Sequence, residues 1–186
     1  MTIEEALLAV IDALDAVGIP YMLVGGTSVS YYGIGRSTKD ADFVLELGDT
    51  SITALTRTLG PAFLLDPRMS FETVTGTYRY QVRVRDMSFI FEFFQLSKDP
   101  HDQERFKRRT QVKLLNRQVW LPTAEDVIIT KLRWGKLANR SKDRDDARDV
   151  IAVQGDRIDW DYVHSWCEQH GTRALLDEIR RSIPPI

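Results

Sequence analysis

The chain has little cysteine and no long apolar run, and both features narrow its class. A single cysteine, Cys167, excludes an internal disulfide and fits a reducing compartment. No stretch is long and apolar enough to span a membrane. The N-terminus carries Glu4 and Glu5 where a signal peptide would carry basic residues. We therefore expect a cytoplasmic protein that makes no membrane contact.

Excess charge, internal repeats and low-complexity tracts are missing as well. The net charge of −2 gives no general attraction to nucleic acid, so any such contact has to be local. The 186 residues, of which 43% are hydrophobic, are enough to fill a real core. We expect an α/β core over residues 1–121 and a packed helical region over residues 122–186, or one single domain that includes both.

Apolar periodicity predicts the main elements. Residues 3–17 form an amphipathic helix, which Thr2 and Glu5 open as a capping box and Gly18 ends. Further helices are expected from about residue 50 to 60, over 124–139, over 143–154, and as two short helices over 159–183. Strands are expected over 21–24, from residue 40 onward, and as a hairpin over 78–85 and 88–96, whereas residues 61–77 show no clear pattern. The fold class is α/β, with a small mixed sheet flanked by helices and a C-terminal helical bundle.

The stretch from residue 24 to 46 carries the most chemistry. Gly25 and Gly26 follow a short apolar strand and allow a sharp turn and a close approach of backbone to ligand. Thr27 and Ser28 are natural N-cap residues for the segment that follows. A helix N-terminus with free N–H groups and two hydroxyls is suited to bind phosphate.

A pair of carboxylates follows this turn. In an extended chain, Asp40 and Asp42 point to one face, about 7 Å apart. Like charges at this distance disfavour each other unless a cation lies between them. Mg²⁺ prefers carboxylate oxygens and commonly binds together with nucleotide phosphates. The pattern therefore predicts metal-dependent handling of a nucleotide.

A third carboxylate, Glu92, lies within the apolar strand Phe89–Phe94. An isolated ionised carboxylate there is costly, so it should have a partner or a metal ion. One interpretation is a glutamate at a sheet edge that pairs with an arginine of residues 78–85. The other is a metal ligand, and from the residues alone the two are about equal.

Two helices after residue 121 carry charges on their apolar sides. Lys131 falls in the middle of the apolar arc of residues 124–139, where a free ammonium is expensive. Asp146 falls on the apolar side of the next helix, so an ion pair with Lys131 is the economical structural explanation. Asp143 lies on that side too, but it is explained as a helix cap. The basic segment from His101 to Arg109 is interpreted as a solvated helix face rather than a phosphate contact.

Together these motifs resemble a known superfamily. The Gly25–Ser28 turn followed by Asp40-x-Asp42 resembles the signature of the nucleotidyltransferase fold, and Phe91-Glu92-Phe93 resembles its third acidic motif, where aspartate is commoner. More narrowly, residues 36–42, 125–131 and 142–146 resemble bacterial minimal and abortive-infection-type nucleotidyltransferases, several of which are toxin–antitoxin components.

The resemblance implies a function and a set of roles. Mg²⁺ or Mn²⁺ would be held by Asp40, Asp42 and Glu92, and a nucleoside monophosphate would pass from an NTP to RNA, protein or a small molecule. The residues implied in catalysis are the three carboxylates and Lys131. Those implied in nucleotide binding are Gly25, Gly26, Thr27, Ser28, Arg36, Lys131 and Asp146. A cognate toxin or antitoxin would be a partner, and the alternative is a non-catalytic nucleotide-binding regulator or antitoxin on the same fold. For Lys131 the resemblance favours a ligand role over a purely structural ion pair.

Overall fold

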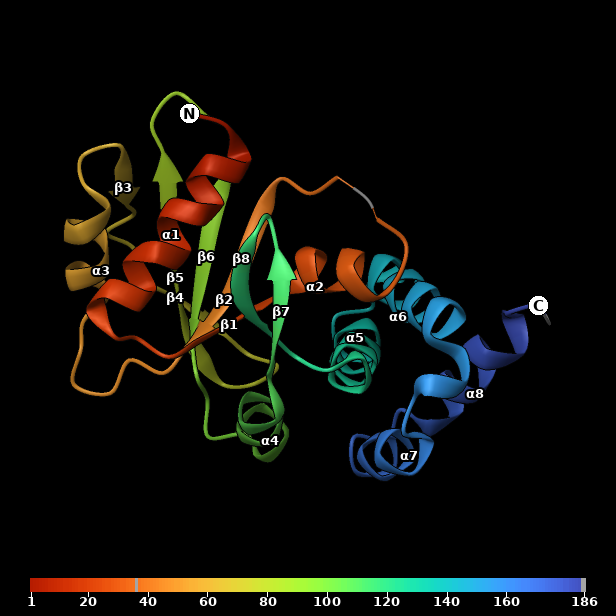
Figure 1. The fold of residues 1–186 in the computed structure, drawn as a ribbon. Coiled ribbons are helices and arrows are strands. Elements are labelled where there is room, and N and C mark those ends of the chain that lie inside the picture. Colours follow the sequence, from red (N-terminus) through yellow and green to blue (C-terminus); the bar gives the residue numbers. More distant parts are fainter. Residues whose placement is uncertain (36, 185–186) are drawn as a thin grey trace. The chain divides into compact units, whose positions relative to one another are not determined.

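The computed structural model describes residues 1–35 and 37–184 (Figure 1). The chain forms two compact units, one of Met1–Thr27 with Ser37–Leu121 and the other of Ser28–Arg36 with Pro122–Ile186. Residues 28–35 thus group with the C-terminal helices. No helix among the described residues has the length and apolar character needed to cross a membrane.

A mixed sheet forms the centre of the first unit. Its strand order is β1-β2-β6-β5-β3, and β4 pairs with the remaining part of β5. β2 and β6 run parallel, and the other neighbours run antiparallel. The bounds are β1 Tyr21–Val24, β2 Asp40–Leu45, β3 Phe63–Leu65, β4 Ser70–Glu72, β5 Thr77–Val84 and β6 Ile90–Gln95. The predicted hairpin of residues 78–85 and 88–96 is therefore confirmed as β5 and β6, with β6 in the middle of the sheet.

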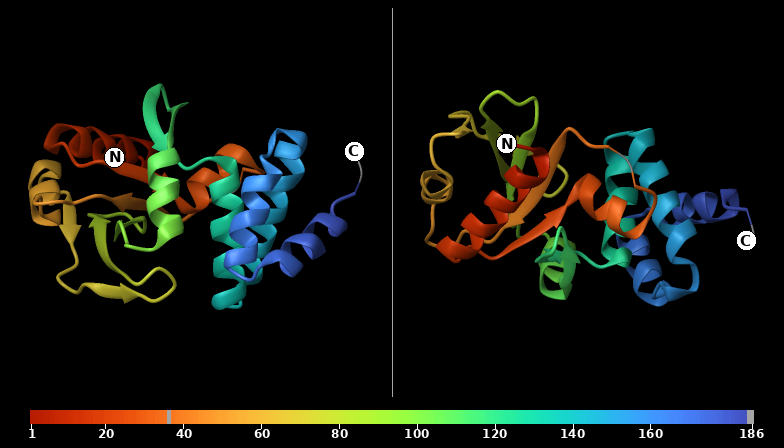
Figure 2. Two further views of the ribbon diagram at one scale, coloured as in Figure 1. Left: turned by 90° about the horizontal axis from the view of Figure 1, so that it is seen from below. Right: turned by 45° about the horizontal axis from the view of Figure 1, so that its top comes forward.

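The two faces of this sheet differ in chemistry. On one face the rings of Phe43, Phe91 and Phe93 pack against one another and are fully buried. Helix α1 (Ile3–Val17) crosses the sheet, and its apolar stripe is buried (Figures 1 and 2). The opposite face is apolar at one end, where Phe106 of α4 (Pro100–Arg108) packs with a cluster that includes Val44. Beyond this cluster the same face turns polar.

The segment in which the sequence shows no clear pattern, residues 61–77, contains two short strands. β3 and β4 have three residues each, and both pair with β5. Strands this short carry too few residues to show an alternating pattern. Helix α3 (Ile52–Leu59) precedes them, and the Ser51 side chain caps it by accepting from the backbone N–H of Ala54. A separate hairpin of β7 (Thr110–Leu114) and β8 (Arg117–Leu121) ends the first unit.

Helices build the second unit. α5 (Ala124–Leu137) and α6 (Ser141–Gln154) lie side by side, followed by the 3-10 turn η1 (Gly155–Arg157), α7 (Trp160–Gln169) and α8 (Arg173–Ser182) (Figure 2). Their shared core includes Val29 from α2 (Gly25–Tyr32). The predicted helical bundle is confirmed, and the fold class with it.

Candidate active site

Register places the three predicted carboxylates on one face of the sheet. Asp42 and Glu92 are direct partners across the parallel β2–β6 pair, and Asp40 lies two residues before Asp42 on the same strand. Because side chains alternate along a strand, all three project from the face that also carries Val44. They are partly exposed, whereas the intervening Ala41 is buried.

Asp42 also lies against the glycine turn. Gly25 follows β1 directly and has a φ of +62°, which L side chains rarely adopt. A Cβ at Gly25 would lie 1.9 Å from Oδ2 of Asp42, so a side chain there would displace the carboxylate. The glycine is therefore required both by backbone geometry and by the close approach of Asp42.

Helix α2 begins at Gly25, earlier than expected. Gly26 and Thr27 lie in its first turn, and Ser28 is buried within it. The prediction that Thr27 and Ser28 are N-cap residues is therefore wrong. Because α2 begins at Gly25, directly after β1, Thr27 and Ser28 lie inside the helix and not at the position before its first residue.

The Glu92 carboxylate is held by two donors from β5. Nη1 of Arg79 donates to Oε2 at 3.2 Å, and Nε2 of Gln81 donates to Oε1 at 2.7 Å. Gln81 lies directly opposite Glu92 across the β5–β6 pair, so its side chain is close enough to donate this hydrogen bond. The predicted pairing of Glu92 with an arginine of residues 78–85 is confirmed, but its predicted place at a sheet edge is wrong, because β6 pairs with β2 on one side and β5 on the other. Glu92 also lies on the same face as Asp40 and Asp42.

The donor set has the chemistry of a divalent-cation site, although the side chains are not gathered around one point. Asp40 accepts a hydrogen bond from Oγ1 of Thr38 at 2.6 Å, while Glu92 is turned to β5. Within residues 1–35 and 37–184, no three His, Cys, Asp or Glu side chains are grouped so as to hold a metal ion. Three carboxylates on one face suit Mg²⁺ or Mn²⁺ in ligand type. Their closure around an ion would require Glu92 to change partners.

Lys131 in the second unit joins two buried aspartates. Its Nζ lies 2.8 Å from Oδ1 of Asp143 and 2.9 Å from Oδ2 of Asp146. The side chains of both aspartates are 3% exposed, and that of Lys131 is 15% exposed. The ion pair with Asp146 is as expected. The helix-cap interpretation of Asp143 is wrong, because α6 begins at Ser141 and the carboxylate turns to Lys131 and to Arg140 at 3.3 Å.

Two further buried acidic groups were not predicted from the sequence. Asp126 of α5 is fully buried and accepts a hydrogen bond from the Tyr162 hydroxyl at 2.8 Å. Asp102 on α4 is buried beside Arg105, whose Nε donates to it at 2.6 Å, so the solvated-face interpretation of this helix is wrong there. Helical periodicity alone ranks residues by polarity and cannot recognise a buried polar partner.

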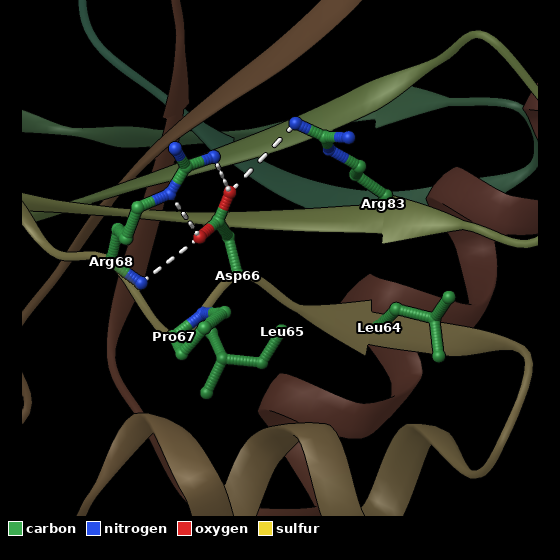
Figure 3. Close-up of a pocket in the computed structure, with 6 residues that line it drawn as sticks. All are labelled: Leu64, Leu65, Asp66, Pro67, Arg68 and Arg83. Atoms are coloured by element: carbon green, nitrogen blue, oxygen red, sulfur yellow. Dashed lines mark hydrogen bonds and ion pairs between the residues drawn. The ribbon is translucent and has the colours of Figure 1, made fainter.

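A shallow pocket lies at the end of the sheet, around Asp66 (Figure 3). Figure 3 shows Asp66 between Arg68 and Arg83. The ion-pair distances from Asp66 to these two arginines are 3.1 and 3.8 Å. Hydrogen bonds from the Arg68 side chain and backbone lower the pKa of Asp66 to about 2. This pocket holds two arginines and one carboxylate and is therefore net positive, which distinguishes it from the β2–β6 face with its three carboxylates.

Comparisons with known proteins support the fold. The solution structure of the antibiotic-resistance factor ANT(2'')-Ia matches with a TM-score of 0.60 at 13% identity, covering 95% of both chains. LnuA, a lincosamide antibiotic adenylyltransferase with bound lincomycin, matches with a TM-score of 0.54 at 11% identity over 81% of this chain and 97% of that one. The chain has the nucleotidyltransferase fold. An antigenic nucleotidyltransferase-like protein from Paracoccidioides brasiliensis agrees, with a TM-score of 0.55, 16% identity and coverage of 97% and 94%.

Sequence similarity adds nothing to this fold assignment. No protein-family model matches the chain, and no curated protein matches it. The likeness is therefore one of three-dimensional structure, and the toxin–antitoxin resemblance stays a prediction. So do the site roles, including that of Arg36, which lies outside the described residues.

Proposed function

We propose that the chain transfers a nucleoside monophosphate from an NTP to an acceptor hydroxyl. One observation carries this proposal, namely the position of Asp42. It is the register partner of Glu92, and its carboxylate lies where a side chain at Gly25 would be. A carboxylate face and the glycine-rich start of a helix thus share one place, as a metal-bound triphosphate requires.

Each residue of this face has a role in the proposal. Asp40, Asp42 and Glu92 would hold Mg²⁺ or Mn²⁺, which when bound neutralises phosphate charge and lowers the pKa of a coordinated hydroxyl. Gly25, Gly26 and Thr27, in the first turn of α2, would cradle the phosphate oxygens. Two relatives in fold support nucleotidyl transfer by their names: LnuA as an adenylyltransferase, and ANT(2'')-Ia through its complex with adenylyl-2''-tobramycin.

The proposal extends to ligands and partners. Lys131 and Asp146 would contribute to NTP binding, and the acceptor would be an RNA end, a protein hydroxyl or a small molecule. A cognate toxin or antitoxin would bind the chain if the narrower resemblance holds. A labelling experiment separates these acceptors.

The experiment follows the transferred nucleotide. The purified protein is incubated with each α-³²P-labelled NTP, Mg²⁺ or Mn²⁺, and in separate reactions total RNA, cell protein, or tobramycin and lincomycin. We expect label to enter one acceptor class. Asp42→Asn should reduce this labelling by at least about 100-fold, because a ligand of the metal is lost.

A matched control is Asp66→Asn, which removes a carboxylate outside the β2–β6 face. It should label at the rate of the wild type. Equal labelling by the wild type and Asp42→Asn would contradict the proposal.

The second candidate is a nucleotide-binding regulator without transferase activity. It is favoured by the hydrogen bonds that commit Glu92 to Arg79 and Gln81. Saturable NTP binding by calorimetry, sensitive to Gly26→Val yet without labelling of any acceptor, would establish it in place of the enzyme.

A further inference from the structure

Glu92 differs from Asp40 in the partners of its carboxylate. Both of its oxygens accept hydrogen bonds from β5, Oε2 from Arg79 at 3.2 Å and Oε1 from Gln81 at 2.7 Å. Asp40 accepts instead from a neutral hydroxyl two residues away in its own chain segment. Any cation that uses Glu92 therefore has to compete with a guanidinium that is already in place.

Arg79 is anchored independently of Glu92. Its Nε donates to Oγ of Ser70 at 3.0 Å, and Ser70 is its register partner across β4 and β5. Its guanidinium also lies 6.0 Å from the centre of the Phe94 ring. The Arg79 side chain is 34% exposed and that of Glu92 is 16% exposed. Release of Glu92 would therefore leave Arg79 positioned, hydrated and able to take another anion.

On the basis of the function proposed above, we propose that Arg79 is a positioning residue that couples metal binding to nucleotide binding. Without nucleotide, Arg79 competes with the divalent cation for Glu92. When an NTP binds, one of its phosphates replaces Glu92 as the partner of Arg79, and Glu92 turns to the metal ion. Arginine suits this exchange because carboxylate and phosphate both match its planar donors. The coupling is reciprocal, so metal also favours nucleotide.

The test is a Mn²⁺ titration in which free Mn²⁺ is measured by electron paramagnetic resonance, with and without a non-hydrolysable ATP or GTP analogue. Arg79→Gln should bind Mn²⁺ alone about threefold to tenfold more tightly than the wild type, because the competing cation is gone. The gain in Mn²⁺ affinity on adding the analogue should shrink in the variant. Unchanged or weaker binding of Mn²⁺ alone would overturn the proposal.

Two further variants act as controls. Arg83→Gln removes an arginine from the same strand and face, but one that pairs with Asp66, so its Mn²⁺ affinity should equal that of the wild type. Arg79→Lys keeps the positive charge beside Glu92, so most of the competition with Mn²⁺ for this carboxylate should remain. If Arg79→Gln does not fold, Gln81→Met frees the other oxygen of Glu92 and should tighten Mn²⁺ binding to a smaller extent. Loss of Mn²⁺ affinity in Gln81→Met would then overturn the proposal.

Asp42→Asn separates failure of this inference from failure of the proposed function. If Asp42→Asn abolishes Mn²⁺ binding while Arg79→Gln leaves it unchanged, the metal site stands and only the role of Arg79 is overturned. If the wild type and Asp42→Asn bind Mn²⁺ equally weakly, the metal site itself is overturned, and the coupling falls with it.

Discussion

Two groups of acidic residues in this chain are arranged in opposite ways. On the β2–β6 face, Asp40, Asp42 and Glu92 are partly exposed and project from adjacent strands. In the helical unit, Asp143 and Asp146 are buried and share one lysine. The first group is partly open to solvent, although Glu92 already pairs with Arg79. The second group is buried around Lys131, and burial makes the loss of that cation expensive.

This difference predicts that the second group contributes more to stability than the first. Buried, paired charges hold α5 and α6 together, and an NTP that used Lys131 would compete with Asp143 and Asp146 for it. Carboxylates at the surface of a rigid sheet keep part of their hydration and stay available to a ligand. Substitutions in each group should therefore affect different measurements.

The largest stability effect is expected at Lys131. Lys131→Met leaves Asp143 and Asp146 buried without the ammonium that joins them, and should lower the free energy of unfolding by about 3–5 kcal/mol. For a chain of this length that corresponds to a Tm lower by about 10 °C, measured by circular dichroism. Replacing both aspartates by leucine in addition should restore much of the loss.

The control for Lys131 is Lys142→Met, which removes an exposed lysine from α6. Its Tm should stay near that of the wild type. A Lys131→Met protein with unchanged Tm but lost NTP binding would instead support the ligand role that the family resemblance implies.

A smaller effect on stability, combined with a specific effect on binding, is expected at Gly25. Gly25→Ala introduces a side chain at a φ of +62° and should cost about 1–2 kcal/mol from the backbone alone. The added Cβ also displaces the Asp42 carboxylate, so Mn²⁺ affinity should fall by about tenfold or more.

Gly18→Ala is the matched variant for this test. Gly18 has a φ of +68°, and a Cβ added there would meet no other atom within 4 Å. Gly18→Ala therefore has the same backbone strain as Gly25→Ala, but it displaces no carboxylate. Thermal unfolding should shift similarly in both proteins, whereas only Gly25→Ala should lose Mn²⁺ binding. Equal Mn²⁺ affinities would mean that Asp42 is not a metal ligand.

The smallest effect is expected at Asp66, whose side chain is less exposed than that of Glu92 and more exposed than those of Asp143 and Asp146. Its folded-state pKa of about 2 lies below the ordinary value of 3.8, so its ion pairs stabilise the fold above about pH 4. That contribution is lost as the pH falls through about 2. The Tm difference between the wild type and Asp66→Asn should be present at about pH 6 and shrink steadily below about pH 4.

Asp49→Asn, a change at an exposed carboxylate, serves as the reference for Asp66. Its Tm should stay near that of the wild type at the pH at which Asp66→Asn is compared. A pH-independent difference for Asp66→Asn would mean that Arg68 and Arg83 do not hold this carboxylate in solution.

The sequence by itself determined the elements that rest on local chemistry. The capping box of Thr2 and Glu5, the left-handed cap at Gly18 and the alternation that puts Asp40 and Asp42 on one face depend only on neighbours in the chain. The β5–β6 hairpin and the four C-terminal helices follow from the same local periodicities. The conformation of these segments is set by residues close to them in the sequence, and these predictions were therefore confirmed.

Only the tertiary structure decided the partners of the charged groups. The sequence shows that Glu92 and Lys131 need partners, but it does not show that Glu92 faces Arg79 and Gln81 or that Lys131 holds Asp143 as well as Asp146. The short strands β3 and β4 likewise exist because β5 offers them hydrogen bonds. Pairing across strands and helices depends on register and packing between distant segments, and those are set by the whole fold rather than by any one stretch of the chain.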